Sequence, residues 1–344
     1  MWQIDLKNTN PEAAEFDLIY VQDIGLKPMG NGLVNEYYVS QYLERLVLED
    51  DDFGSVICCR QNMKEKIGHP WLMMACKNGA LSGSTDGMQF FGKTYRETGI
   101  PEALLADSLG GNCAGESPVV ALQEKPFYLD AGQNHQSVFV ANYLSDHAHA
   151  TSMEDLKKLT ALFLELSTTT VVSDASRMIA PERNLFNTSA FLPVNELTQD
   201  ELDQYFGAER RHEEFENGKL LSFFCGQNNH VMLHAKELLA DRPHAHIMQA
   251  GTGFVPDENI MSTTSFAFGV FNSHISQGNT NFNVLLSVCT TQFNTSPESG
   301  QHIFVELDGT KYLLGLPSAF EIGLNHCRWI YKSGGNVFQV RSWT

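Results

Sequence analysis

Four histidines are spaced so that they could bind a metal ion. His230 and His234 lie four residues apart, and His244 and His246 lie two apart, so each pair would line one side of a strand. A bound zinc ion needs further ligands and hydrogen-bonded supporting groups, and the sequence gives no carboxylate that converges on these rings. We therefore interpret them as hydrogen-bonded or exposed histidines, and predict no metal site and no cofactor.

Histidine and glutamate side chains can also serve together as acid and base. His234 or His274, combined with Glu237 or Glu321, are the candidates for this chemistry, which would make the chain a stand-alone sandwich enzyme of the mutarotase type. Inverting glycosyl transfer would instead need a general acid and a nucleophile on the opposite face of the sugar. No Asp or Glu residue stands in a context that marks it for that task, so we predict no catalytic residue.

Aromatic side chains offer a third kind of chemistry, because a pyranose presents an apolar C–H face that can stack on a ring. Trp71 follows Pro70 next to an expected loop, and we treat it as a candidate carbohydrate contact. Trp329, Tyr331 and Trp343 lie in strand-like stretches near the C-terminus. For Trp329 we expect a place in the core of a sandwich.

Three other stretches resemble functional motifs but lack an essential part. The acidic run at residues 49–52 does not have EF-hand spacing, and we interpret it as a solvated turn. Residues 113–117 follow two glycines but contain no GxSxG elbow, and residues 251–253 lack the third glycine of a dinucleotide fingerprint. The second and third stretches are interpreted as Gly-rich connections.

The composition narrows the class of protein. The chain has 344 residues, 42% of them hydrophobic, and a net charge of −18 from 23 basic and 41 acidic side chains. Such a surface repels nucleic acids and anionic membranes. The 7 cysteines are odd in number and form no CxxC pair, so we expect reduced, buried thiols. With no recognisable leader and no apolar run of membrane-spanning length, we predict a cytoplasmic protein.

Most of the chain alternates apolar and polar residues with a period of two, which is typical of β-strands. Two helices interrupt this pattern, one starting at Ser152 with Asp155 at capping-box spacing, the other at Thr198 with Glu201. Residues 308–309 and 333–336 supply two hairpin turns. The predicted strands cover residues 2–7, 16–22, 55–60, 71–76, 137–143, 220–225, 231–235, 303–307, 311–314, 328–332 and 337–343.

These elements predict a mainly β protein with two sandwich units. We expect a first β-sandwich in residues 1–150, a helical linker in 151–210 and the start of a second sandwich in 211–344. A similarity between residues 32–41 and 269–277 favours two related sandwiches. Strands lie at both ends of the sequence and unpaired sheet edges are costly, so we expect only the first half of the second sandwich, in a fragment of a longer protein.

Several stretches spread over nearly the whole chain resemble one family of carbohydrate-active enzymes. Examples are NEYYVSQY at residues 35–42 and STDGMQFFG at residues 84–92. The others are residues 19–26, 55–62, 69–71, 209–212, 220–224, 235–238, 242–244, 300–305, 317–321 and 327–331. On these stretches the chain resembles the N-terminal region of large bacterial proteins of glycoside hydrolase family 94, in the branch of cyclic β-1,2-glucan synthase and 1,2-β-oligoglucan phosphorylase.

The resemblance implies supersandwich units of the galactose-mutarotase-like kind joined by a helix-containing linker. It also implies a catalytic (α/α) toroid outside this sequence, so no catalytic residue of the family can be carried onto this chain. The parent enzyme would be a phosphorylase or glycosyltransferase that acts on β-linked, expected β-1,2, glucans with inorganic phosphate as co-substrate. We therefore expect a non-catalytic region that shapes the active-site rim or a homodimer. The alternatives are a stand-alone carbohydrate-binding module that uses Trp71, and the mutarotase-type enzyme.

Overall fold

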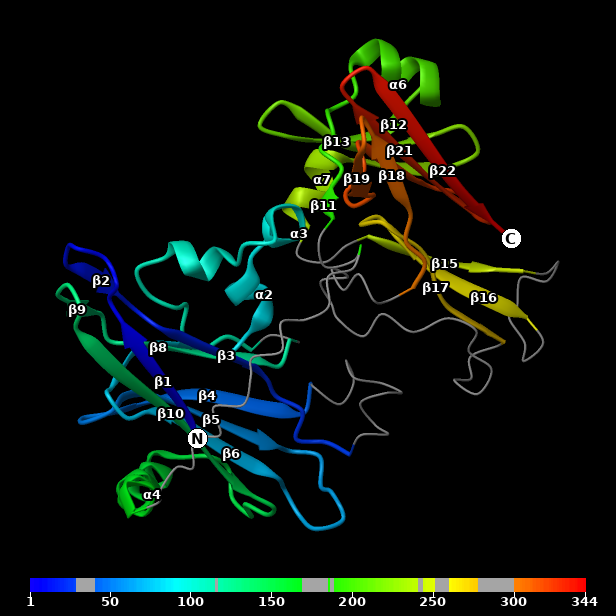
Figure 1. Ribbon diagram of the computed structural model, residues 1–344. Coiled ribbons are helices and arrows are strands. Elements are labelled where there is room, and N and C mark those ends of the chain that lie inside the picture. Colours follow the sequence, from blue (N-terminus) through cyan, green and yellow to red (C-terminus); the bar gives the residue numbers. More distant parts are fainter. Residues whose placement is uncertain are drawn as a thin grey trace. The chain divides into compact units, whose positions relative to one another are not determined.

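The computed structural model divides the chain into two compact units (Figure 1). Unit 1 consists of Met1–Gly92 and Ile100–Met178, and unit 2 consists of Lys93–Gly99 and Ile179–Thr344. The structure describes residues 1–28, 41–114, 117–168, 185, 189–240, 244–250, 260–277 and 300–344. Strands dominate both units, and the prediction of a mainly β fold is confirmed.

Unit 1 is built on one eight-stranded, almost entirely antiparallel sheet. Its strands follow the order β1 (Trp2–Lys7), β10 (Asn134–Leu144), β6 (Trp71–Cys76), β5 (Gly54–Gln61), β7 (Ala80–Ser84), β8 (Val119–Glu124) and β3 (Ile19–Asp23), and β4 (Leu43–Asp50) pairs with β5. The two ends of this order meet, because the rings of Trp2 on β1 and Tyr20 on β3 lie 4.8 Å apart. The sheet is therefore strongly curled, which is how a twisted sheet of this size covers its own inner face.

Both faces of the central strands of unit 1 are buried. Successive side chains point to opposite faces of a strand, so Cys58 and Cys59 belong to different clusters. The inner cluster contains Ile57, Cys59, Leu72, Met74, Val120, Leu122 and Phe139. The outer cluster contains Val56, Cys58, Trp71, Met73, Val138 and Val140.

A helix covers the outer cluster of unit 1. The 3₁₀ turn η2 (Met153–Leu156) runs into α4 (Lys157–Thr168), which lies beside the sheet of unit 1 (Figure 1). Leu159 and Phe163 of α4 pack in the outer cluster. Ser152 and Asp155 form the capping box that the sequence predicted. The smaller elements of unit 1 are β2 (Ala14–Phe16), β9 (Phe127–Leu129), α2 (Gly87–Phe91) and η1 (Glu102–Leu105).

Unit 2 contains a six-stranded antiparallel sheet in the order β12 (Arg211–Glu216), β13 (Lys219–Cys225), β14 (Asn229–Leu233), β20 (Ala319–Ile322), β21 (His326–Ser333) and β22 (Asn336–Trp343). One face of this six-stranded sheet packs in a core to which two three-stranded sheets also contribute. They are β15 (Ala245–Gln249), β16 (Met261–Phe266) and β17 (Val270–Gln277), and β11 (Ala190–Phe191), β19 (Thr310–Leu313) and β18 (Phe304–Leu307). Trp329 is fully buried in this core, as predicted.

Helix α6 (Gln199–Phe206) packs on the other face of the six-stranded sheet. Its Leu202 and Phe206 bury against Phe223 of β13, and its start is the predicted capping box of Thr198 and Glu201. Unit 2 also contains α3 (Tyr95–Thr98) and α7 (His234–Leu239). The predicted strand at 231–235 was wrong at its end, because α7 begins at His234, whose amide donates to the Ser318 carbonyl.

Other expectations have mixed outcomes. Both predicted hairpins are confirmed, since β18 and β19 flank residues 308–309 and β21 and β22 flank residues 334–335. The run 16–22 is divided between β2 and β3. Residues 32–40 of the internal similarity, and residues 169–184 and 186–188 of the expected helical linker, lie outside the described residues. The predicted domain boundaries, 1–150, 151–210 and 211–344, stay predictions.

Two further findings concern the cysteine thiols and the helices. Six cysteines in the described ranges are free thiols, and burial raises the pKa of Cys59 to about 12, which keeps it protonated and unreactive. In the described part of the chain, no helix has the length and apolarity that crossing a membrane would require.

Candidate functional site

Trp71, the candidate carbohydrate contact, lies at the start of β6 inside the outer cluster of unit 1. Its ring is 0% exposed. The His147 ring stacks on it with centroids 4.8 Å apart and planes 12° apart. The Trp71 Nε1 donates to Thr151 Oγ1 at 3.1 Å. The Lys158 ammonium lies 5.5 Å from the ring centroid. Trp71 is thus a core residue here, and a sugar could reach its ring only if this cover moved away.

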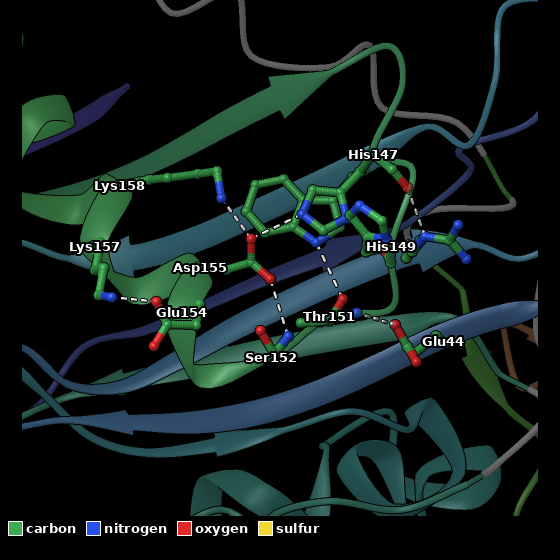
Figure 2. A network of polar contacts seen from close by, with 11 residues as sticks. Glu44, His147, His149, Thr151, Ser152, Glu154, Asp155, Lys157 and Lys158 are labelled. Atoms are coloured by element: carbon green, nitrogen blue, oxygen red, sulfur yellow. Dashed lines mark hydrogen bonds and ion pairs between the residues drawn. The ribbon is translucent and has the colours of Figure 1, made fainter.

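The cover of Trp71 belongs to a polar cluster centred on Asp155 (Figure 2). Asp155 Oδ1 lies 2.8 Å from His147 Nε2 and accepts from Lys158 Nζ at 2.5 Å, while Oδ2 accepts from the Ser152 amide at 2.9 Å. Burial acts to raise the pKa of Asp155, but Lys158, the Ser152 amide and His147 together hold that pKa below its usual range. Asp155 is therefore a carboxylate at neutral pH.

His147 is held by acceptors on both sides of its ring. Its Nδ1 lies 2.7 Å from the His149 carbonyl, and its Nε2 faces Asp155 (Figure 2). Arg60 Nε also donates to the His147 carbonyl at 2.9 Å. The Asp155 cluster thus joins strands β5 and β6 to the start of α4, and its groups are occupied with one another.

Two of the histidine–glutamate candidates of the sequence, His234 and Glu237, lie on the short helix α7. Glu237, on α7 and almost fully buried, pairs with His244 Nδ1 and accepts from the His244 amide at 3.3 Å. His234 Nδ1 instead faces the Pro317 carbonyl at 3.2 Å. The described contacts of these two candidates are therefore with His244 for Glu237 and with Pro317 for His234. The side chain of His274 lies outside the described residues.

The two predicted histidine pairs do not line a strand face. His230 lies on β14 and stacks on Phe224 at 4.5 Å, whereas His234 already belongs to α7. Burial and the neighbouring His244 lower the pKa of His230, which favours its neutral form. His246 on β15 lies 3.4 Å from the Leu324 carbonyl. Within the ranges that the structure describes, no three His, Cys, Asp or Glu side chains form a group that could hold a metal.

Glu321 lies in a pocket on the six-stranded sheet of unit 2. Arg328 Nε donates to its Oε2 at 2.5 Å, and Asn229 Nδ2 donates to its Oε1 at 2.8 Å. His326 Nε2 lies 4.0 Å from the same Oε1. Glu321, His326, Arg328 and Arg341 line a hollow of about 250 Å³. Of these four residues, the sequence analysis named only Glu321 as a candidate. Arg328 and Arg341 could have been found from the hairpin turn at 333–336, because this turn makes them partners across two strands.

Comparison with known protein families finds one matching domain in each half of the chain. Residues 1–141 match the SOGP N-terminal domain, and residues 208–344 match the glycoside phosphorylase supersandwich domain. These two matches confirm the resemblance to the N-terminal region of glycoside phosphorylases that the motifs indicated.

One curated relative is similar along almost the whole chain. It is a 1,2-beta-oligoglucan phosphorylase of Listeria innocua serovar 6a (strain ATCC BAA-680 / CLIP 11262), 29% identical over 331 residues. The matched part is 95% of this chain but 29% of the relative. The chain thus spans less than a third of the length of this relative.

Proposed function

We propose that this chain is the N-terminal, non-catalytic region of a glycoside phosphorylase that acts on β-1,2-glucans with inorganic phosphate as co-substrate. The observation that carries the proposal is the order of the two matched domains, N-terminal domain then supersandwich domain, within a similarity that covers 95% of this chain and 29% of the relative. The catalytic toroid would then belong to polypeptide beyond this chain. In the parent enzyme, the two units would shape the active-site rim or contribute to a homodimer in the cytoplasm.

The side-chain geometry supports a non-catalytic role. Asp155 is bound by His147, Lys158 and the Ser152 amide, and Glu237 is bound by both the ring and the amide of His244. Phosphorolysis needs a general acid that can reach the glycosidic oxygen and a free position for the attacking phosphate. These two carboxylates are engaged in holding elements together, so we assign neither of them that task.

The proposal is tested by activity assays on two proteins. The chain as given, checked for folding by circular dichroism, is incubated with a sugar 1-phosphate and sophorose-type acceptors, and phosphate release is measured. The same assay is run on a longer protein in which this chain is joined to the reading frame that follows it. We expect release only from the longer protein; clear turnover by the chain alone would overturn the non-catalytic role.

The linkage and the binding-module alternative need a separate measurement. Calorimetric titration of the chain with β-1,2-glucans and with a β-1,3-glucan as control measures whether the chain alone holds substrate. Because Trp71 is covered by His147, we expect no heat of binding at millimolar glucan. Saturable binding of the β-1,2-glucan would favour the alternative that the chain is itself a carbohydrate-binding module.

A further inference from the structure

Three charged residues follow one another across the six-stranded sheet of unit 2. Glu321 on β20 is the register partner of Arg328 on β21, and Arg328 is the register partner of Arg341 on β22. Register partners in an antiparallel pair have their side chains on the same face of the sheet. The row therefore reads carboxylate, guanidinium, guanidinium, and its three residues line the Glu321 pocket together with His326.

Arg328 is already engaged within the fold. Its Nε donates to Glu321 at 2.5 Å, and its Nη2 donates to the carbonyl of Tyr205 at 3.1 Å. Tyr205 lies in the last turn of α6, where backbone carbonyls carry partial negative charge. The Arg328 guanidinium also lies 4.8 Å from the centre of the Phe206 ring. Arg328 thus attaches the end of α6 to the sheet, and its charge offsets that of Glu321.

Arg341 is in a different situation. It lines the same hollow of about 250 Å³ and is exposed to solvent. Throughout the described ranges, no hydrogen bond or ion pair is formed by its guanidinium. Its register partner is another arginine, and like charges directly opposite each other on a sheet are unfavourable. With Glu321 and Arg328 offsetting each other, the pocket retains one positive charge on a chain whose net charge is −18.

We propose that this pocket binds the phosphate group of a small soluble molecule, either free phosphate or a sugar phosphate. A guanidinium presents a planar fork of donors that matches two oxygens of a phosphate. His326 lines the same pocket. A bound anion would separate the charges of Arg328 and Arg341 and remove their mutual repulsion. The buried Glu321, at the opposite side of the row, limits how much negative charge the pocket accepts. The inference stands independently of the proposed function.

The test is calorimetric titration of the intact chain with inorganic phosphate at low ionic strength, with sodium chloride at matched ionic strength as the blank. We expect saturable binding that weakens as salt is added. Arg341→Gln should weaken it by about tenfold or more, because charge-assisted hydrogen bonds are among the strongest polar contacts. Arg341→Lys should retain part of it. The matched control is Lys311→Gln, which removes the same charge from an exposed strand position and should leave binding unchanged.

Three results would overturn the proposal. The first is the absence of saturable heat with phosphate, and the second is equal weakening by Arg341→Gln and Lys311→Gln, which would mean general charge attraction. The third is acetate binding as tightly as phosphate, which would exclude preference for a phosphate group. Parallel titration with a sugar 1-phosphate identifies the source: tighter binding than phosphate supports a sugar phosphate, and equal or weaker binding supports the free ion. Unchanged melting curves of the variants establish that they are folded.

Discussion

The Asp155 cluster of unit 1 and the Glu321 pocket of unit 2 each pair a buried carboxylate with a cationic side chain, Lys158 in the first and Arg328 in the second. In the Asp155 cluster, both oxygens of the carboxylate and both nitrogens of His147 are engaged, and the groups are nearly inaccessible to solvent. In the Glu321 pocket, Arg328 is engaged three times but the neighbouring Arg341 is not engaged. A cluster whose groups are all engaged holds elements together, whereas one that leaves a charge at an opening can take a ligand.

The largest expected effect concerns Trp71, which the Asp155 cluster covers. Trp71→Ala removes a fully buried ring and leaves a cavity beneath His147, so we expect a loss of about 3–5 kcal/mol in the free energy of unfolding. Urea unfolding followed by circular dichroism measures it. Tyr143→Ala, at an exposed aromatic of the same sheet, is the control and should cost about 0.5 kcal/mol or less. Equal losses would mean that Trp71 is not the core residue described above.

The next effect concerns Arg328 of the Glu321 pocket. Arg328→Gln leaves Glu321 buried without its strongest donor and releases the end of α6, so we expect a loss of about 2–3 kcal/mol. Urea unfolding at neutral pH is again the measurement. Glu321→Gln together with Arg328→Gln should recover part of the loss, because a buried amide costs less than an unpaired buried carboxylate. No recovery in the double variant would contradict the role of Arg328 as the partner of Glu321.

A smaller effect, with a definite pH dependence, follows from Asp155. Asp155→Asn keeps the shape but removes the charge that holds His147 and Lys158, and we expect a loss of about 1–2 kcal/mol at pH 7. Because the pKa of Asp155 is lowered in the folded chain, its contribution is fully present above the unfolded pKa near 3.8 and is lost as the pH falls through the folded pKa. The difference between wild type and variant should therefore shrink below about pH 4.

The control for this pH dependence lies one residue away. Glu154 pairs with Lys157 on the exposed side of the same turn, where solvent screens the charges. Unfolding free energies of wild type, Asp155→Asn and Glu154→Gln, measured from pH 7 to pH 3, should show convergence with wild type for Asp155→Asn alone. A constant difference across this range would mean that the charge of Asp155 is not what stabilises the cluster.

Much of the fold could be predicted from local sequence because the devices that define it are local. The capping boxes at Ser152 and Thr198 join residues three apart, and a hairpin turn sets the register of its two strands. The pairing of Arg328 with Arg341 follows directly from the turn at 333–336. The start of α7 at His234 was missed because Val231 to Ala235 has the residue types of a strand, while the helix start depends on a contact with distant Ser318.

The sites were less predictable because their partners come from distant parts of the chain. Trp71 follows a proline next to a loop, which indicates exposure, but His147 and Thr151 cover it from more than seventy positions further on. Glu237 pairs with His244, whereas Nδ1 of His234 faces the Pro317 carbonyl. These contact partners cannot be predicted from residue spacing along one strand or helix, because they depend on how the sheets are assembled.

The smallest expected effect gives the sharpest test of the comparison. Arg341→Gln removes a guanidinium that holds no partner in the described structure and that faces Arg328, so we expect a change of about 0.5 kcal/mol or less in the free energy of unfolding, with relief of repulsion favouring the variant. Urea unfolding beside Arg328→Gln measures the contrast within one pocket. A loss comparable to that of Arg328→Gln would show that Arg341 supports the fold. The Glu321 pocket would then hold elements together, as the Asp155 cluster does.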